Sequence, residues 1–199
     1  MASHDFQDAV HRVRAQLTVP ATVERPILII LSGLPGTGKS TLAARLEQAL
    51  PAVSISSDQV RQVLFPYPAY NFDENRRVHA VARALMRHFL RQGSSVIADA
   101  TNLAEWHREI LQDLATRIKA PTLLVQTTAP RTIIQARLRQ RFSHRIRYDF
   151  SMADWGVYEQ MALTVEPIRG THLCVDTSKN PDRIVSRIVR AARRAQLGR

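Results

Sequence analysis

The sequence has 199 residues, of which 45% are hydrophobic and 23% are charged, as in an ordinary globular protein of one domain or of one domain with a small lid. No apolar run is long enough for a membrane span, the N-terminus lacks the basic and apolar regions of a signal peptide, and a single cysteine excludes an intramolecular disulfide framework. We therefore expect a cytoplasmic protein, with Cys174 buried in the apolar run 173–175.

The formal net charge of +11 raises the question of nucleic-acid binding, because lysine and arginine neutralise phosphates. Only three of the 28 basic residues are lysines, a bias that a GC-rich coding sequence would also produce. Arginines concentrate in 131–147 and in 183–199, with six in each range. In the second range they alternate with apolar residues at helical spacing, which favours the solvated face of a terminal helix. Because this explanation does not cover the first range, nucleic acid stays among the candidate partners.

Apolar runs divide the chain into a short N-terminal segment and a main domain. Residues 1–25 are predicted to form an amphipathic helix, over 3–17, and a linker into the domain at 26–199. Residues 27–31 are continuously apolar and rich in β-branched side chains, which predicts a buried parallel strand. Further strands are predicted at 53–55, 95–98, 123–127 and 172–175.

Helices are predicted between these strands from helical spacing and start signals. They begin at Lys39, at a capping box of Asn71 and Glu74, at about 103, at Pro130, after Ser151 and Asp154, and at Asn180. In the helix over 103–118, the residues expected to face the core are Ile110, Leu111, Leu114 and Ile118. Strands that alternate with helices predict an α/β fold of three layers, a five-stranded parallel sheet flanked by helices.

A complete phosphate-binding loop, Gly33-x-x-x-x-Gly38-Lys39-Ser40, lies between the first predicted strand and a helix. Its glycines let backbone N–H groups converge on phosphate oxygens, and the helix N-terminus adds partial positive charge. Lys39 is expected to reach the β- and γ-phosphates, and the Ser40 hydroxyl to ligate Mg²⁺. The expected nucleotide-binding residues of this loop are Gly33, Pro35, Gly36, Thr37, Gly38, Lys39, Ser40 and Thr41. The sequence therefore predicts a nucleoside triphosphate site.

Asp99 closes the predicted strand at 95–98, where P-loop enzymes place a second acidic group near Mg²⁺. The alternative is an aspartate that caps the next helix through Thr101 or Asn102. The next residue is Ala100 rather than glutamate, so the acidic pair typical of motor ATPases is missing. This argues against a mechanochemical ATPase.

Asp58 and Arg61 follow the predicted strand at 53–55, and their spacing of three puts both side chains on one face of a helix start. A carboxylate there is suited to accept the proton of an acceptor hydroxyl, and an arginine to hold the substrate or a phosphate. The alternative is a helix N-terminal aspartate with an incidental ion pair. From spacing alone both interpretations stay open.

The arginine-rich helix after Pro130 is a candidate lid, over about 131–150. Arg137 and Arg141 are four residues apart, share a helix face and can act on one ligand. A hinged arginine helix can close over a triphosphate and stabilise charge on its oxygens. The other arginines are interpreted as a solvated face: Arg131, Arg139 and Arg145. The seven histidines show no metal-ligand spacing, and we interpret them as surface or packing residues.

With these residues together, the chain resembles the P-loop kinase family of the polynucleotide 5′-kinases, with its zeta-toxin-like and chloramphenicol-phosphotransferase-like relatives and its AAA-type ATP-binding domain. The matching segments run in the family's order. They are Gly-Leu-Pro-Gly-Thr-Gly-Lys-Ser-Thr at 33–41, Ser-Ser-Asp-x-x-Arg at 56–61, Val-Ile-Ala-Asp-Ala-Thr-Asn-Leu at 96–103, the arginines at 137–141, and Val-Asp-Thr-Ser at 175–178.

The resemblance implies a P-loop NTPase fold and an ATP- and Mg²⁺-dependent kinase that phosphorylates a hydroxyl group. It implies that Asp58 is the general base, that Arg61 steadies the acceptor or its phosphate, and that Asn102 contacts the substrate. Around the nucleotide, the resemblance implies that Arg141 contacts the transferring phosphoryl group and that Arg137 lies on the adenine side. It also implies that Thr177 and Ser178 lie near the nucleotide base, and that Ser40 and Asp99 bind the metal. The acceptor stays open between a 5′-hydroxyl nucleic acid and a small molecule, and a nucleotide-regulated ATPase or binding protein is the alternative of another class.

Overall fold

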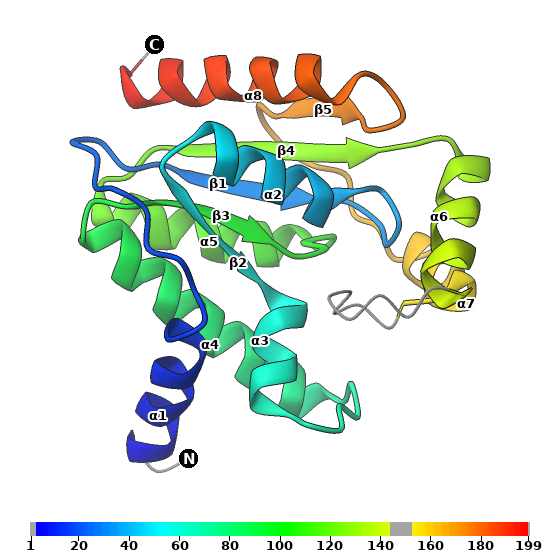
Figure 1. Ribbon diagram of the computed structural model, residues 1–199, viewed down its shortest axis with the longest axis horizontal. Coiled ribbons are helices and arrows are strands. Elements are labelled where there is room, and N and C mark those ends of the chain that lie inside the picture. The colour runs from blue at the N-terminus through cyan, green and yellow to red at the C-terminus, as the bar shows by residue number, and fades with distance from the viewer. Residues whose placement is uncertain (1–2, 144–152, 199) are drawn as a thin grey trace.

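A five-stranded parallel sheet organises the computed structural model, which describes residues 3–143 and 153–198 (Figure 1). The strand order is β2-β3-β1-β4-β5, so β1 lies at the centre. The strands are β1 (Leu28–Ser32), β2 (Ala52–Ser56), β3 (Ser95–Asp99), β4 (Thr122–Thr128) and β5 (Leu173–Asp176). The predicted five-stranded parallel sheet is confirmed.

Helices connect the strands and cover both faces of the sheet (Figure 1). They are α1 (Ser3–Arg14), α2 (Lys39–Ala49), α3 (Ser57–Leu64), α4 (Phe72–Arg91), α5 (Glu105–Ile118), α6 (Arg131–Ser143), α7 (Trp155–Ala162) and α8 (Pro181–Gln196). In Figure 1, α6 and α7 lie together beyond one end of the sheet, on the side where the strand arrows point. Within the described ranges, no helix has the length and apolar character to span a membrane.

The side chains of β1 alternate between two hydrophobic cores. Leu28 and Ile30 pack with α4 and α5, together with residues of α1 and α3. Ile29 and Leu31 point to the opposite face and pack with α2 and α8. Because a strand at the centre of the sheet is covered on both sides, all five residues of β1 are buried, which explains the unbroken apolar run.

Polar caps set the start of several helices. Asn71 accepts a hydrogen bond from the Glu74 backbone N–H at 2.9 Å and so caps α4, while Asn180 caps α8 ahead of Pro181. The start of α7 is capped by Asp154, which accepts from Val157 N–H at 2.9 Å. Ser151, the other residue proposed for this cap, lies outside the described residues.

Two residues expected in the core are exposed. Ile110 is 37% exposed because the apolar arc of α5 is wider than the face it packs on the sheet, which Leu111 and Leu114 fill. Cys174 is exposed because it lies on the edge strand β5, where its neighbour Val175 takes the side that faces the α2–α8 core. Both expectations were wrong for the same reason, because an apolar run does not reveal which side of an element is covered.

The core around α4 yields a test of stability. Phe89 is fully buried, so Phe89→Ala is expected to lower the free energy of unfolding by about 3–5 kcal/mol through lost burial and a residual cavity. Phe72 on the same helix is 78% exposed, and Phe72→Ala is the matched control. Urea denaturation followed by circular dichroism measures both variants. A loss at Phe89 no larger than that at Phe72 would contradict this view of the core.

Candidate active site

The phosphate-binding loop connects β1 to α2 at the carboxyl end of the sheet. Gly36 and Gly38 have left-handed φ values of 77° and 84°, which side chains disfavour. Gly38 is the N-cap of α2 and, in the described structure, provides no side-chain hydrogen bond to the first turn. The N-cap residue therefore has no side chain that competes with an anion for the N-terminal amides of α2, which suits a phosphate site.

The glycines are also required because other elements press on the loop. A Cβ atom at Gly36 would lie 2.8 Å from Cγ2 of Ile134 in α6. A Cβ atom at Gly38 would lie 3.2 Å from Oγ1 of Thr177. Lys39 is buried and its Nζ donates to the Leu34 carbonyl at 3.0 Å, which holds the ammonium inside the curve of the loop. These features fit the phosphates of a nucleotide.

Arg137 lies beside the loop and binds the turn after β5. Its Nη1 donates to the Gly36 carbonyl at 3.3 Å and to Oγ1 of Thr177 at 2.9 Å, and its Nη2 donates to the Thr177 carbonyl at 2.9 Å. The Thr177 hydroxyl in turn donates to the Thr37 carbonyl at 2.8 Å. A cavity of about 360 Å³ opens here, lined by Gly36, Gly38, Thr41, Leu42, Arg45, Arg137, Gln140, Thr177, Pro181 and Ile184. This cavity is the natural place for a base that extends from the loop.

Ser178 is placed differently from Thr177. Its N–H and hydroxyl donate to Oδ1 of Asp176 at 2.9 and 2.7 Å, and these two bonds lower the pKa of the Asp176 carboxyl. Ser178 is exposed and is not among the residues that line the 360 Å³ cavity. Of the two residues proposed near the base, the structure therefore brings only Thr177 to the cavity.

A second cavity, of about 470 Å³, extends from the other side of the phosphate loop. Its wall includes Lys39, Ser40, Asp58, Arg61 and Asp99. The residues expected to bind the nucleotide and those expected to bind the acceptor therefore line the same cavity. The sheet causes this convergence, because Asp99 at the end of β3 pairs in register with Ser56, the N-cap of α3. The rest of the lining comes from α2, β2, α3, α4, α7 and the loops: Pro35, Gly36, Gly38, Thr41, Ser56, Ser57, Tyr70, Asn75, His79, Ala100, Thr101, Ala153, Val157 and Met161.

Asp99 is 5% exposed and lies in the cavity wall beside the phosphate loop. It does not cap the following helix, because the N-cap of α5 is Ala104. Among the residues that the structure describes, no group of three or more His, Cys, Asp or Glu side chains is arranged to hold a metal ion. Mg²⁺ in nucleotide sites takes one or two protein oxygens together with phosphate oxygens and water, so Ser40 and Asp99 fit that need.

Arg61 is 6% exposed and is held by residues of α4. Its Nη2 donates to Oδ1 of Asn75 at 2.5 Å, and its Nη1 lies 3.4 Å from Oε2 of Glu74. The guanidinium carbon lies 4.7 Å from the centre of the Tyr70 ring, a cation–π arrangement. The remaining donor, Nε, is buried and has no hydrogen-bond partner in the described part of the protein.

Glu74 organises this side of the cavity. Its carboxylate accepts from Ala69 N–H at 2.9 and 3.0 Å and from Tyr70 N–H at 2.8 Å, which holds Tyr70 at a left-handed φ of 54°. The predicted capping box is therefore only half formed, since Asn71 caps Glu74 but the Glu74 carboxylate binds the preceding loop. The bonds fix the Tyr70 ring against Arg61 at the cost of local backbone strain.

His79 forms an uncharged part of the cavity wall. Burial, and after it the charge–charge interactions with His107, Arg83 and Arg61, lower the pKa of His79 to about 4. The ring of His79 lies 5.0 Å from that of His107, whose pKa is also lowered, first by burial. Near neutral pH the His79 imidazole therefore adds no charge to the cavity wall.

Asn102 lies behind the phosphate loop and is not among the residues that line the cavities of about 470 and 360 Å³. Its Nδ2 donates to the Leu31 carbonyl at 2.7 Å, and its own carbonyl accepts from the Ser32 hydroxyl at 3.0 Å. Its left-handed φ of 44° turns the chain toward this contact. Asn102 therefore fastens the loop after β3 to the end of β1.

Only part of the proposed lid can be placed. The backbone of Arg141 is in α6, while its side chain and the residues Arg145 and Arg147 lie outside the description. At the start of α6, Arg131 forms an ion pair with Glu159 of α7 at 2.7 Å and stacks on Trp155 at 5.0 Å. The first arginine thus joins the two helices rather than pointing only to solvent.

Several residues of the cavity escaped the sequence analysis, among them Asn75, Val157 and Met161, and so did the contacts that Glu74 makes with residues 69 and 70. A helix start was visible at 71–74, but nothing in the sequence places it against Arg61 on the preceding helix. The left-handed backbone at position 70 could not be predicted either, because the residue there is a tyrosine rather than a glycine or asparagine.

The parallel sheet, the left-handed glycine loop and the buried lysine at the start of α2 define a nucleotide-binding protein of the P-loop class. Residues 28–168, more than half of the chain, match the family model described as AAA domain, and the chain belongs to this family. No curated protein matches the sequence.

Solved structures share this fold at low identity. Kti12 of Chaetomium thermophilum in complex with ADP-AlF3 is 20% identical with a TM-score of 0.66, over 83% of this chain and 98% of that chain. A gluconokinase of Sinorhizobium meliloti 1021 is 18% identical with a TM-score of 0.63, over 88% and 97%. The Mycobacterium tuberculosis APS kinase CysC in complex with AMPPNP and APS is 15% identical with a TM-score of 0.64, over 83% and 96%. The chain therefore shares its fold with these proteins, two of which are kinases.

The crowding at Gly36 predicts a specific loss of nucleotide binding. Gly36→Ala is expected to weaken binding of AMPPNP with Mg²⁺ at least about tenfold, because the new methyl group displaces the loop from α6. Gly170 has a similar φ of 83° with open space around it, so Gly170→Ala controls for backbone strain alone. Isothermal titration calorimetry measures both affinities. Equal affinities in the two variants would contradict the role of the Gly36 approach.

The low pKa of His79 predicts a dependence of stability on pH. The unfolded chain binds a proton below about 6.5, whereas the folded protein does so only below about 4, so stability is lost as the pH falls from 6.5 to 4. His79→Gln is expected to reduce that loss by about 1–3 kcal/mol, with a remainder from His107. Urea denaturation at pH 4.5 and 7.5 measures it, and the exposed His4→Gln is the control. An unchanged difference between the two pH values would refute the assignment.

Proposed function

We propose that this protein is an ATP- and Mg²⁺-dependent kinase that transfers the γ-phosphoryl group of ATP to a hydroxyl group of an acceptor. The observation that carries the proposal is the cavity of about 470 Å³ that Lys39 and Ser40 share with Asp58 and Arg61. A phosphate loop alone binds a nucleotide, but a carboxylate and an arginine across the same cavity provide for a second substrate. The kinases among the structural neighbours support this interpretation.

The donor side is formed by the phosphate loop and by Asp99. ATP supplies the phosphoryl group, and Mg²⁺ offsets negative charge on its phosphates. Lys39 and the amides at the start of α2 would bind phosphate oxygens, and Ser40 with Asp99 would hold the metal. Arg137 and Thr177 border the cavity of about 360 Å³ in which the base would lie.

The acceptor side is formed by α3, α4 and α7. Asp58 would accept the proton of the attacking hydroxyl, and the free Nε of Arg61 would donate to an oxygen of the acceptor. Glu74, Asn75 and Tyr70 hold the Arg61 guanidinium in one orientation, which lowers the entropy lost on binding. Arg141 on the lid helix would approach the transferring phosphoryl group, where charge develops.

The shape of the acceptor side favours a small molecule over a 5′-hydroxyl nucleic acid. Tyr70 and His79 border it from one side, and Val157 and Met161 of α7 border it from another. The volume of about 470 Å³ is that of a pocket for a small molecule and also includes space beside the phosphate loop. We therefore favour a small-molecule kinase of the zeta-toxin or antibiotic-phosphotransferase type, while the polynucleotide-kinase-like activity remains the alternative within this class.

A nucleotide-regulated ATPase or binding protein is the alternative of a different class. The residue after Asp99 is Ala100, which cannot activate water as the glutamate of an acidic pair does. ATP labelled at the γ-position separates the two functions. A kinase moves the label to a component of a panel of metabolites and 5′-hydroxyl oligonucleotides, whereas an ATPase releases it only as phosphate.

The two sides of the cavity predict different losses on substitution. Asp58→Asn is expected to lower transfer to the acceptor by about 10²–10⁴-fold, because proton removal is lost while the volume is kept. Its affinity for AMPPNP should stay that of the unmodified protein. Lys39→Ala is the contrasting variant and should weaken nucleotide binding itself. Mass spectrometry of the acceptor panel and calorimetry measure the two effects, and full transfer by Asp58→Asn would remove the base assignment.

A further inference from the structure

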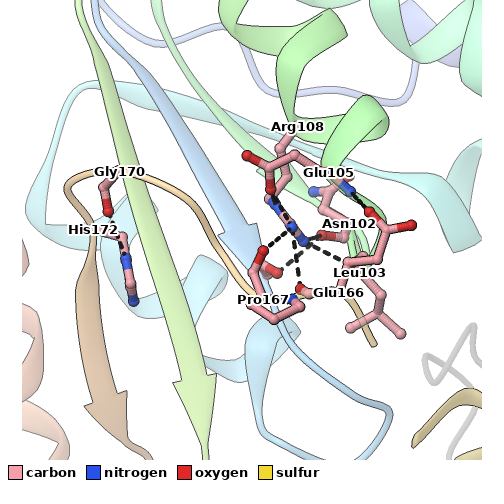
Figure 2. Close-up of polar contacts among 9 residues, drawn as sticks. Asn102, Leu103, Glu105, Arg108, Glu166, Pro167, Gly170 and His172 are labelled. Carbon is pink, nitrogen blue, oxygen red and sulfur yellow. Dashed lines mark hydrogen bonds and ion pairs between the residues drawn. The ribbon is translucent and has the colours of Figure 1, made fainter. Parts of the chain in front are cut away.

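Arg108 is the largest fully buried charged side chain of the described protein, and it lies outside both cavities. It is only 1% exposed and comes from the first turn of α5. Figure 2 shows its guanidinium inside a ring of oxygen atoms, with Gly170 and His172 lying apart. A buried arginine of this kind needs a reason, because moving its charge out of water is costly.

The guanidinium joins two segments that are about 60 residues apart in sequence (Figure 2). On one side, Nη1 donates to the carbonyls of Asn102 and Leu103 at 2.8 and 2.7 Å. On the other, Nη2 donates to the carbonyls of Glu166 and Pro167 at 3.2 and 3.0 Å. Its charge is balanced by Glu105, which Nε contacts at 2.9 Å and Nη2 also contacts. All three guanidinium nitrogens have partners, so this is no ligand site.

Glu166 strengthens the same junction independently of the Arg108 side chain. Its carboxylate accepts from Glu105 N–H at 2.6 Å, and its own N–H donates to the Leu103 carbonyl at 3.2 Å. The N-cap of α5 is Ala104, whose methyl side chain cannot accept a hydrogen bond from the first turn of the helix. Glu166 therefore supplies, from a distant segment, the cap that the local sequence lacks.

One end of this junction leads to the phosphate loop. Asn102, whose carbonyl Arg108 binds, is hydrogen-bonded to Leu31 and Ser32 at the end of β1. The adjacent Thr101 carbonyl accepts from Gly33 N–H at 2.9 Å, at the first residue of the loop. Arg108 is thus two hydrogen-bonded steps from the start of the phosphate loop.

The other end leads to the wall of the acceptor cavity. Residues 163–167 follow α7, the helix that presents Val157 and Met161 to the cavity. The same helix also packs on α6 through Tyr158, next to Ile134. With α6 on one side and the Arg108 junction at its end, α7 has a defined distance from the phosphate loop.

We propose that Arg108 is a positioning residue that fixes the α7 wall of the acceptor cavity relative to the phosphate loop. The inference rests on the proposed phosphoryl transfer. Kinases exclude water from the phosphoryl group during transfer, and a wall that is not fixed admits it. An arginine is required because its planar fork reaches carbonyl groups on two segments at once, whereas a lysine ammonium cannot.

The test uses Arg108→Lys, which keeps the charge but loses the fork. Hydrogen exchange of residues 155–167 is expected to rise about tenfold, while the amides of α2 stay protected. The rate constant for hydrolysis of saturating ATP, with no acceptor present, is expected to rise about threefold or more as water enters. The affinity for AMPPNP with Mg²⁺ should change less than about twofold, because the phosphate loop keeps its own contacts.

Glu166 provides a second variant that keeps the test decisive if Arg108→Lys does not fold. Glu166→Ala removes the cap of α5 and should give the same local exchange and faster hydrolysis, while Glu166→Gln retains an oxygen acceptor and should restore both. Asp5→Asn is the matched control, since it breaks the α1–α4 ion pair with Arg77 away from the cavities. It should change neither readout.

Two results would overturn the proposal: unchanged exchange of residues 155–167, or an increase spread evenly over the domain with slower hydrolysis. The outcome is separate from that of the proposed function. That function fails if the unmodified protein moves no label from ATP to any acceptor, whereas hydrogen exchange and hydrolysis are measured with no acceptor at all.

Discussion

Three parallel strands end at the same level of the sheet, because Leu31 pairs with Asp99 and Asp99 pairs with Ser56. This register brings the phosphate loop after β1, the carboxylate of β3 and the helix start after β2 to a single edge. Open parallel sheets bind ligands there because loops diverge from the strand ends and leave a crevice. The cavity of about 470 Å³ is the result, and its catalytic candidates come from segments that are far apart in the chain.

The basic side chains Lys39 and Arg61, which line this cavity, are each hydrogen-bonded to oxygen atoms of the protein. Arg61 is buried against Glu74 and Asn75, so its charge is balanced and its orientation is fixed before a substrate arrives. Burial keeps His79 neutral near pH 7, so this residue adds no charge to the cavity wall. Lys39 is held by the Leu34 carbonyl inside the phosphate loop. Both cations are thus held in place by oxygen acceptors of the protein itself.

Buried polar contacts, rather than apolar packing alone, connect the working parts of the protein. Asn102 fastens the loop after β3 to β1, Arg108 fastens the segment after α7 to that loop, and Arg137 fastens α6 to the turn after β5. Such contacts are directional, so they set distances that a hydrophobic core leaves adjustable. Their donors meet backbone carbonyls, which is why they can join segments of unrelated sequence.

The sequence by itself determined the sheet, the helices between its strands, the phosphate loop and Asp99 at the end of β3, because apolar periodicity and glycine spacing are local properties. Local patterns also placed Asp58 and Arg61 on one helix start. Only the tertiary structure decided that Glu74 holds Tyr70 and Arg61, that Arg108 joins two distant segments, and that Asn102 lies behind the loop. The tertiary structure also decided that the side chains of Cys174 and Ile110 are exposed to solvent. The physical reason is that side-chain partners, and the side of an element that is covered, depend on which surfaces meet in space. The spacing of residues along the sequence does not determine which surfaces meet.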